Sequence, residues 1–153
     1  MAADAPALPI LLVSEGPEPP GIVERFGEFD SLIATALASS SVAAAARFDL
    51  SCMVRVYAGD PLPPNPAGKF GAVLLSGSKY NVTETHHDWL EPLKRWVREH
   101  SGTLPIFGIC FGHQLLTVAF EGAVAPMEAG KWGGGAVECA IDRSAAAQDE
   151  VFG

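Results

Sequence analysis

The chain has 153 residues, which suffice for one ordinary domain with a single hydrophobic core but not for two full domains. Hydrophobic residues make up 48% of the chain and charged residues 18%, a balance typical of a folded globular protein and not of a disordered tail. The formal charge of -8 opposes non-specific attraction to polyanions, so we expect no nucleic acid and no membrane surface as partner.

The sequence shows no targeting segment and no disulfide framework. The apolar run near the N-terminus carries Asp4 and has no positive residue ahead of it, unlike a secretory signal. No stretch approaches the roughly 20 apolar residues that span a bilayer. Cys52, Cys110 and Cys139 are widely and irregularly spaced, and no CxxC pair suggests zinc. We therefore expect a reducing compartment and a cytoplasmic protein.

The first half of the chain alternates between predicted strands and helices. Residues 8–13 are a continuous apolar run closed by a proline-rich loop, which predicts a buried parallel strand. Residues 22–38 have apolar side chains at helical spacing and predict a helix, whereas the alanine-rich stretch up to Arg47 is not assigned. Residues 51–58 alternate and are rich in β-formers, predicting a second strand, and residues 59–69 predict a loop.

The second half continues the alternation. Residues 71–76 predict a third strand, and residues 86–100 predict an amphipathic helix. The apolar face of that helix is expected to hold Trp89, Leu93, Trp96 and Val97. Residues 104–109 predict a fourth strand and residues 111–121 a short apolar helix that ends at Gly122. A last strand is expected at residues 135–141, paired with a short one near residues 123–127.

This order of elements predicts an α/β fold with a doubly wound, mostly parallel sheet and helices on both faces. One domain would cover residues 1–153. Functional groups in such sheets lie at the carboxyl ends of the strands. The segments after Val13, Ser76 and Ile109 are therefore where chemistry is expected.

Cys110 lies in the segment Gly108-Ile109-Cys110-Phe111-Gly112, which has the pattern G-x-C-x-G between a predicted strand and a predicted helix. This is the thiol form of a nucleophile elbow, which places the reactive atom on a sharp strand-to-helix turn. The two glycines allow strand and helix to approach closely, and the helix N-terminus stabilises a thiolate. The backbone N–H of Phe111 would face an oxyanion formed at Cys110, and the Gly77-Ser78 loop is the natural source of a second donor.

An alternative is that Cys110 is a small buried apolar residue, as free cysteines usually are. The two glycines and the strand-to-helix setting favour the elbow. Cys52 and Cys139 lack that setting and are expected in the core.

A cysteine nucleophile needs a general base, and four histidines are available. His100 precedes the fourth strand and so lies at the amino end of the sheet, far from Cys110. His113 follows in the first turn of the next helix, where its ring points more readily to packing or solvent than to its own turn. His86 and His87 share the correct edge of the sheet, although HHDW also fits an ordinary polar helix start. No histidine in the sequence is a convincing partner.

The motif PIFGICFGHQLL, with LLSGSKYNV upstream and AGKWGGGAVE downstream, resembles the class I glutamine amidotransferase domain. The resemblance covers nearly the whole chain and is closest to the stand-alone, GMP-synthase-like group that includes plant γ-glutamyl peptidases. Gln114 separates the motif from related proteins that share the elbow but usually lack this glutamine. The resemblance implies a flavodoxin-like architecture, a small-molecule substrate, and no metal or organic cofactor.

By this resemblance, Cys110 would attack the γ-carboxamide of glutamine or of a γ-glutamyl peptide and form a γ-glutamyl thioester. Backbone N–H groups of Ser78 and Phe111 would form the oxyanion hole, although many relatives have a second glycine in place of Ser78. Gln114 would help to hold the amino-acid end of the substrate, and Gly77 would shape the pocket. Gln114 also fits an ordinary polar residue of a first helical turn.

Lys131 and Trp132, with Gly133, match the turn that borders the substrate site in the family, and they also fit a glycine-rich hairpin turn. The resemblance further implies a catalytic histidine with a glutamate partner, in an H-x-E or H-x-D context after the last strand. The segment QDEV is only superficially similar to an H-x-D-E-V context, and Ala147 stands where the histidine would be. The segment also comes too soon after residues 135–141 and aligns better with the D-x-x-F stretch that precedes the missing strand in the family. We therefore expect that residues 1–153 lack the C-terminal segment that carries the catalytic His and Glu.

These observations leave three hypotheses open. The first is a glutamine amidotransferase-like hydrolase, whose 153-residue chain would be alkylated at Cys110 but would hardly turn over glutamine. It would pass ammonia to a synthase partner or act alone. The second is a catalytically incomplete binding or regulatory module, or a truncated isoform, that self-associates through an exposed C-terminal sheet edge. The third is a fragmentary gene model without independent function.

Overall fold

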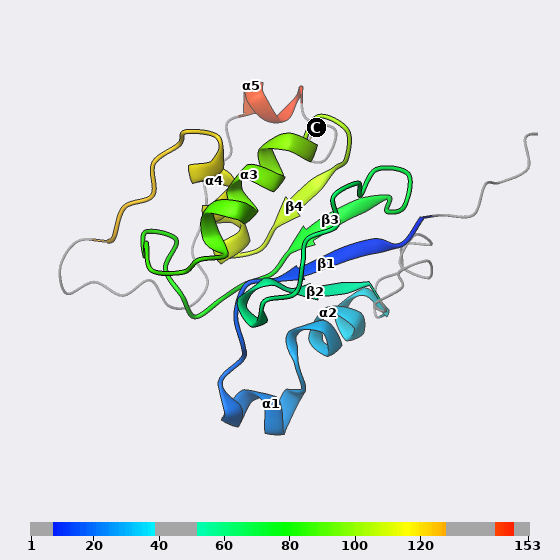
Figure 1. Ribbon diagram of the computed structural model, residues 1–153, viewed down its shortest axis with the longest axis vertical. Coiled ribbons are helices and arrows are strands. Elements are labelled where there is room, and N and C mark those ends of the chain that lie inside the picture. Colours follow the sequence, from blue (N-terminus) through cyan, green and yellow to red (C-terminus); the bar gives the residue numbers. More distant parts are fainter. Residues whose placement is uncertain (1–7, 39–51, 128–142, 149–153) are drawn as a thin grey trace, which may run out of the picture.

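In the part of the chain that the structure describes, four parallel strands form a central sheet (Figure 1). The computed structural model describes residues 8–38, 52–127 and 143–148. Across the sheet the strands follow the order β2-β1-β3-β4, and each neighbouring pair is parallel. Their bounds are Ile10–Ser14 for β1, Met53–Arg55 for β2, Ala72–Leu75 for β3 and Ile106–Gly108 for β4. The parallel order confirms the predicted α/β fold of flavodoxin-like type.

Helices flank this sheet, as expected for parallel strands that are joined by crossovers. Figure 1 shows α1 and α2 beside the β2 end of the sheet and α3 and α4 beside the β4 end. The helices are α1 (Pro20–Phe26), α2 (Phe29–Ala38), α3 (Leu90–His100), α4 (Phe111–Ala119) and α5 (Arg143–Ala146). A 3-10 turn, η2, spans Val56–Ala58.

The core lies where the sheet packs against α3 and α4. Strand β1 is buried from Leu11 to Ser14, as its continuous apolar run predicts. Burial of side chains of this size contributes about 1.5–3 kcal/mol each to folding. The buried members of the cluster that α3 and α4 supply are Leu90, Leu93, Trp96, Val97, Phe111, Leu115 and Ala119.

The register of the strands aligns three chain segments at the carboxyl edge of the sheet. Val13 of β1 pairs with Leu75 of β3, and Leu75 pairs with Gly108 of β4. The residues that follow these three positions therefore leave the sheet side by side. This arrangement brings together the ends of three strands at which the sequence predicted functional groups.

The predicted helix at residues 22–38 is wrong in one respect, because the structure has two helices there. Helix α1 ends at Phe26 and α2 begins at Phe29. Gly27 lies between them with φ +82°, a conformation that interrupts helical geometry and that glycine adopts at low cost.

Two further boundaries differ from the prediction. The second strand ends at Arg55, because the chain turns into η2 and the Arg55 N–H donates to Asp60 Oδ2 at 2.8 Å. The helix predicted from residue 86 begins at Leu90. Its buried face holds Leu93, Trp96 and Val97 as predicted, whereas Trp89 precedes the helix and is half-buried.

The short strand predicted near residues 123–127 is not formed, and this segment has no regular secondary structure. The strand predicted at residues 135–141 and the unassigned alanine-rich stretch lie outside the described residues. Within the described part of the chain, no helix is long and apolar enough to cross a membrane.

Candidate active site

Cys110 occupies the turn between β4 and α4. Its backbone has φ +52° and ψ -103°, a sparsely populated conformation for a residue with a side chain. Such strained residues cluster at functional sites, because the surrounding structure must hold them in place. Cys110 is a free thiol and is exposed, unlike a core cysteine. Cys52 packs against the core as predicted, and Cys139 lies outside the described residues.

The two glycines around Cys110 permit this turn. A Cβ at Gly108 would overlap the backbone of Gly112. A Cβ at Gly112 would lie 2.6 Å from Leu75 Cβ and 2.8 Å from the Leu75 carbonyl oxygen. Both positions therefore need glycine so that β3, β4 and the start of α4 can approach one another, as the sequence predicted.

Hydrogen bonds join this turn to the end of β3. The Gly112 N–H donates to the Ser76 carbonyl at 3.0 Å, and the Ile109 N–H donates to the Leu75 carbonyl at 3.0 Å. A Cβ at Gly77 would lie 3.7 Å from Cys110 Cβ and 3.4 Å from the ring of Phe29. Gly77 and Cys110 are thus close neighbours, although they are 33 positions apart in the sequence.

The two predicted oxyanion donors are Phe111, which follows Cys110 in the chain, and Ser78, which follows Gly77, a close neighbour of Cys110. Within the described residues, neither the Ser78 N–H nor the Phe111 N–H donates a hydrogen bond. The Ser78 hydroxyl instead donates to the Glu15 carbonyl at 3.1 Å and accepts from the Tyr80 N–H at 3.1 Å. The side chain of Ser78 therefore holds this loop against the segment that follows β1.

Glu15 is fully buried directly behind this loop. Its Oε2 accepts from the Ser76 hydroxyl at 2.7 Å and from the Ser76 N–H at 2.8 Å. The Glu15 N–H in turn donates to Ser76 Oγ at 3.2 Å. Glu15 Oε1 is buried and has no hydrogen-bond partner among the described residues. Burial raises the pKa of this carboxyl well above its ordinary value, against the opposing effect of the Ser76 hydrogen bonds.

His86, His87 and His100 make ring contacts with other side chains. His87 Nε2 lies 3.0 Å from Glu84 Oε2, and the His87 ring packs 4.3 Å from the ring of Tyr80 and 5.3 Å from that of Trp89. His100 packs on Trp96, and His113 is exposed on α4. In the described part of the chain, no hydrogen bond joins a histidine to Cys110, and the prediction that none of them is a convincing base stays a prediction.

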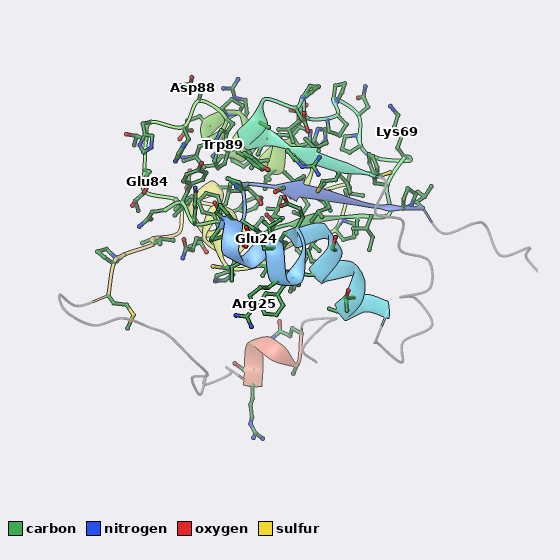
Figure 2. The ribbon with its side chains drawn as sticks, turned by 90° about the horizontal axis from the view of Figure 1, so that it is seen from below. Glu24, Arg25, Lys69, Glu84, Asp88 and Trp89 are labelled. Atoms are coloured by element: carbon green, nitrogen blue, oxygen red, sulfur yellow. The ribbon has the colours of Figure 1, made fainter. Side chains whose placement is uncertain are left out.

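Among the described residues, one group of side chains has atoms spaced for a metal ion. The ligand atoms of Glu84, His86 and His87 lie within 4.8 Å of one another. Figure 2 shows Glu84, Asp88 and Trp89 at the same end of the molecule, opposite Lys69. All three ligand candidates come from one four-residue segment, and the Glu84 carboxylate is already paired with His87, which lowers the pKa of Glu84. Nothing else in the structure points to a metal here.

Of the remaining residues that the sequence predicted for the site, some lie in the described part of the chain and some lie outside it. Gln114 lies half-buried in the first turn of α4, where its N–H donates to the Cys110 carbonyl at 3.1 Å. Lys131 and Trp132 lie outside the described residues. Glu15 and Ser76 were not singled out from the sequence. The available signal was an acidic residue directly after a buried apolar strand, at the edge of the sheet where sites form.

The comparisons with known proteins agree with this arrangement. The family model "Glutamine amidotransferase class-I" matches residues 39–151. This match covers most of the chain, and the chain therefore belongs to the class-I glutamine amidotransferase family, as the motif around Cys110 indicated.

Two curated relatives refine that membership. Over 85 residues, 56% of this chain, it is 33% identical to "GMP synthase [glutamine-hydrolyzing]" of Porphyromonas gingivalis. Over 66 residues, 43% of this chain, it is 32% identical to "Gamma-glutamyl-L-1-hydroxyisopropylamide hydrolase" of a Pseudomonas species. Both support the GMP-synthase-like and γ-glutamyl peptidase-like group. The matched segments span 16% and 22% of those proteins, and no solved structure matches the chain.

Proposed function

We propose that the chain hydrolyses the γ-amide bond of glutamine or of a γ-glutamyl compound through Cys110. The observation that carries this proposal is the exposed thiol of Cys110 on a strained turn between β4 and α4, in a chain of the class-I glutamine amidotransferase family. The position of Cys110 between a strand and a helix supports a nucleophile elbow here. The GMP synthase and the γ-glutamylamide hydrolase among the relatives both carry names that describe cleavage of a γ-glutamyl bond.

In the proposed reaction the Cys110 thiolate attacks the γ-carbonyl carbon of the substrate. A carbon–sulfur bond forms, and the carbonyl oxygen becomes an oxyanion that accepts hydrogen bonds from the Ser78 and Phe111 N–H groups. The C–N bond then breaks, and the nitrogen takes up a proton and leaves as ammonia or an amine. Water hydrolyses the γ-glutamyl thioester, which releases glutamate and restores the thiol.

The other predicted residues would bind the substrate. Gly77, which has no side chain, is a close neighbour of Cys110, and Gln114 lies in the first turn of α4. We propose that Gln114 helps to hold the amino-acid end of the γ-glutamyl group and that Lys131 and Trp132, outside the described residues, border the substrate site. No cofactor takes part, because a thiolate carries out this type of acyl transfer unaided.

All four histidines of the sequence lie in the described part of the chain, and we propose that the general base is a histidine supplied by a longer parent protein or by another chain. A neutral thiol attacks poorly, and a base typically contributes about 10²- to 10⁴-fold to the rate. The helix N-terminus at Phe111 offers partial activation, since backbone dipoles there favour a thiolate. The 153-residue chain alone is therefore expected to form the thioester slowly and to release glutamate more slowly still.

The test is covalent labelling with the 4-nitrophenyl γ-ester of glutamate, whose leaving group needs no proton donor. We expect the chain to gain the mass of one γ-glutamyl group at Cys110, with one equivalent of 4-nitrophenol released. Cys110→Ala should abolish both signals, and Cys52→Ala, the matched control, should retain them. Labelling that survives Cys110→Ala would refute the proposal, and reversible binding without acylation would favour a binding module instead.

A further inference from the structure

The peptide bond between Gly77 and Ser78 carries the predicted oxyanion donor on one side and a hydrogen-bonded carbonyl on the other. The Ser76 hydroxyl lies 2.8 Å from the Gly77 carbonyl oxygen and is placed to donate to it. The described residues contain no cis peptide bond, so the Gly77 carbonyl and the Ser78 N–H point in opposite directions. A donor that holds the carbonyl therefore also fixes the direction of the N–H.

The Ser76 hydroxyl has two candidate acceptors but only one proton to donate. One acceptor is the Gly77 carbonyl at 2.8 Å, and the other is Glu15 Oε2 at 2.7 Å. If Ser76 donates to Glu15, the Gly77 carbonyl loses its donor and the peptide can rotate. The protonation state of Glu15 therefore decides which acceptor receives the proton.

A proton on the Glu15 carboxyl would settle which of the two acceptors receives the Ser76 hydroxyl proton. Glu15 is fully buried, and its Oε1 has no donor within the described residues, which would leave an ionised carboxylate half unpaired. A proton on Oε2 can be donated to Ser76 Oγ, which then accepts from Glu15 twice, through Oε2–H and through the backbone N–H at 3.2 Å. Oε2 still accepts a hydrogen bond from the Ser76 N–H. The same N–H also donates to the Val13 carbonyl. The Ser76 proton is then free for the Gly77 carbonyl.

We propose that Glu15 is a positioning residue: by donating to Ser76 it directs the Ser76 hydroxyl onto the Gly77 carbonyl and so fixes the Ser78 N–H beside Cys110. This inference rests on the proposed function, because the fixed N–H serves as an oxyanion donor. Two further contacts join the same parts of the structure. The Ser78 hydroxyl donates to the Glu15 carbonyl, and the Ser76 carbonyl accepts from Gly112 in the first turn of α4.

Glu15→Gln and Ser76→Ala separate this role from a purely structural one. The glutamine must turn its oxygen toward the Ser76 N–H, and that oxygen then also attracts the Ser76 hydroxyl proton, so the Gly77 carbonyl loses its donor. Ser76→Ala removes the donor outright. The matched control is Glu24→Gln, which changes an exposed glutamate on α1 (Figure 2).

Two reactions of Cys110 are compared in the full 153-residue chain. Acylation by the 4-nitrophenyl γ-ester of glutamate passes through an oxyanion, whereas alkylation by iodoacetamide does not. We expect both variants to slow acylation by about tenfold to a hundredfold, since loss of one oxyanion donor costs on the order of 10²-fold or more. Alkylation should stay within about twofold of the unchanged chain. The double variant should lose no more than Ser76→Ala alone, because both residues act through one hydrogen bond.

Equal losses in acylation and alkylation would mean that the variants merely disturb the turn at Cys110, and unchanged acylation in Glu15→Gln would also overturn the inference. Failure of the proposed function has a different result, in which the unchanged chain is alkylated but not acylated. The carbonyl ¹³C resonance of Gly77 then gives an independent reading. It should shift in the same direction in Glu15→Gln and Ser76→Ala but not in Glu24→Gln, and a resonance that does not move contradicts the role of Glu15.

Discussion

At the scale of single residues, the carboxyl of Glu15 makes stability depend on pH. Burial raises its pKa well above the ordinary value of 4.5, so the folded chain binds this proton more tightly than the unfolded chain. The resulting stabilisation is fully present below about pH 4.5 and is lost as the pH rises through the raised pKa of the folded state. The hydrogen-bond partners of Glu15, which are Ser76 and backbone groups, do not titrate in this range.

Urea unfolding of the unchanged chain and of Glu15→Gln across this pH range checks the sign. Glutamine carries no proton to lose, so the free energy of unfolding of the unchanged chain should fall relative to that of the variant as pH rises. A difference between the two chains that does not change with pH would show that Glu15 has an ordinary pKa.

Gly112 shows how one missing side chain sets the geometry of the turn at Cys110. An added Cβ would lie 2.6 Å from Leu75 Cβ, closer than side-chain atoms approach one another, and the backbone of Leu75 could not move without breaking its pairing with Gly108. We expect Gly112→Ala to lower the free energy of unfolding by about 1–3 kcal/mol, the usual cost of overpacking. Urea denaturation measures this change. Gly102→Ala is the control, because nothing lies within 4 Å of its added Cβ.

At the scale of elements, helix α3 is held by its buried face. Leu93 is fully buried among core side chains, and the Trp96 Nε1–H donates to the Pro63 carbonyl at 2.7 Å. We expect Leu93→Ala to destabilise the fold by about 2–5 kcal/mol, because a buried leucine leaves a cavity when truncated. Arg95→Ala, on the exposed side of the same helix, should change stability by less than about 0.5 kcal/mol. Thermal unfolding of both variants tests this prediction. Equal destabilisation by Leu93→Ala and Arg95→Ala would contradict it.

Element boundaries were less predictable than element types. The period of apolar residues predicted a helix at residues 22–38, but that period continues across Gly27, and only the positive φ of this glycine separates α1 from α2. The β-rich segment at residues 51–58 likewise continues past the end of β2. Local contacts such as the bond from Arg55 to Asp60 end the strand, and such contacts leave no trace in hydrophobic periodicity.

At the scale of the whole molecule, the parallel sheet assembles the proposed site from three distant segments. Residues after β1, β3 and β4 leave the same edge of the sheet, as is general for doubly wound folds. Glu15, Gly77 and Cys110 therefore become neighbours through strand register and not through closeness in the chain. This edge carries both the thiol and the hydrogen bonds that we propose to orient its oxyanion donors.

The sequence by itself determined the α/β class, the buried face of α3 and the turn at Cys110, because each depends on apolar spacing or on glycines within a few residues. It did not determine the role of Glu15, whose partner Ser76 lies 61 residues away. Only the pairing of Val13 with Leu75 places these two residues side by side at the ends of their strands. Long-range pairing of this kind also buries the carboxyl, and burial is the physical reason why an ordinary loop glutamate becomes a group with a raised pKa.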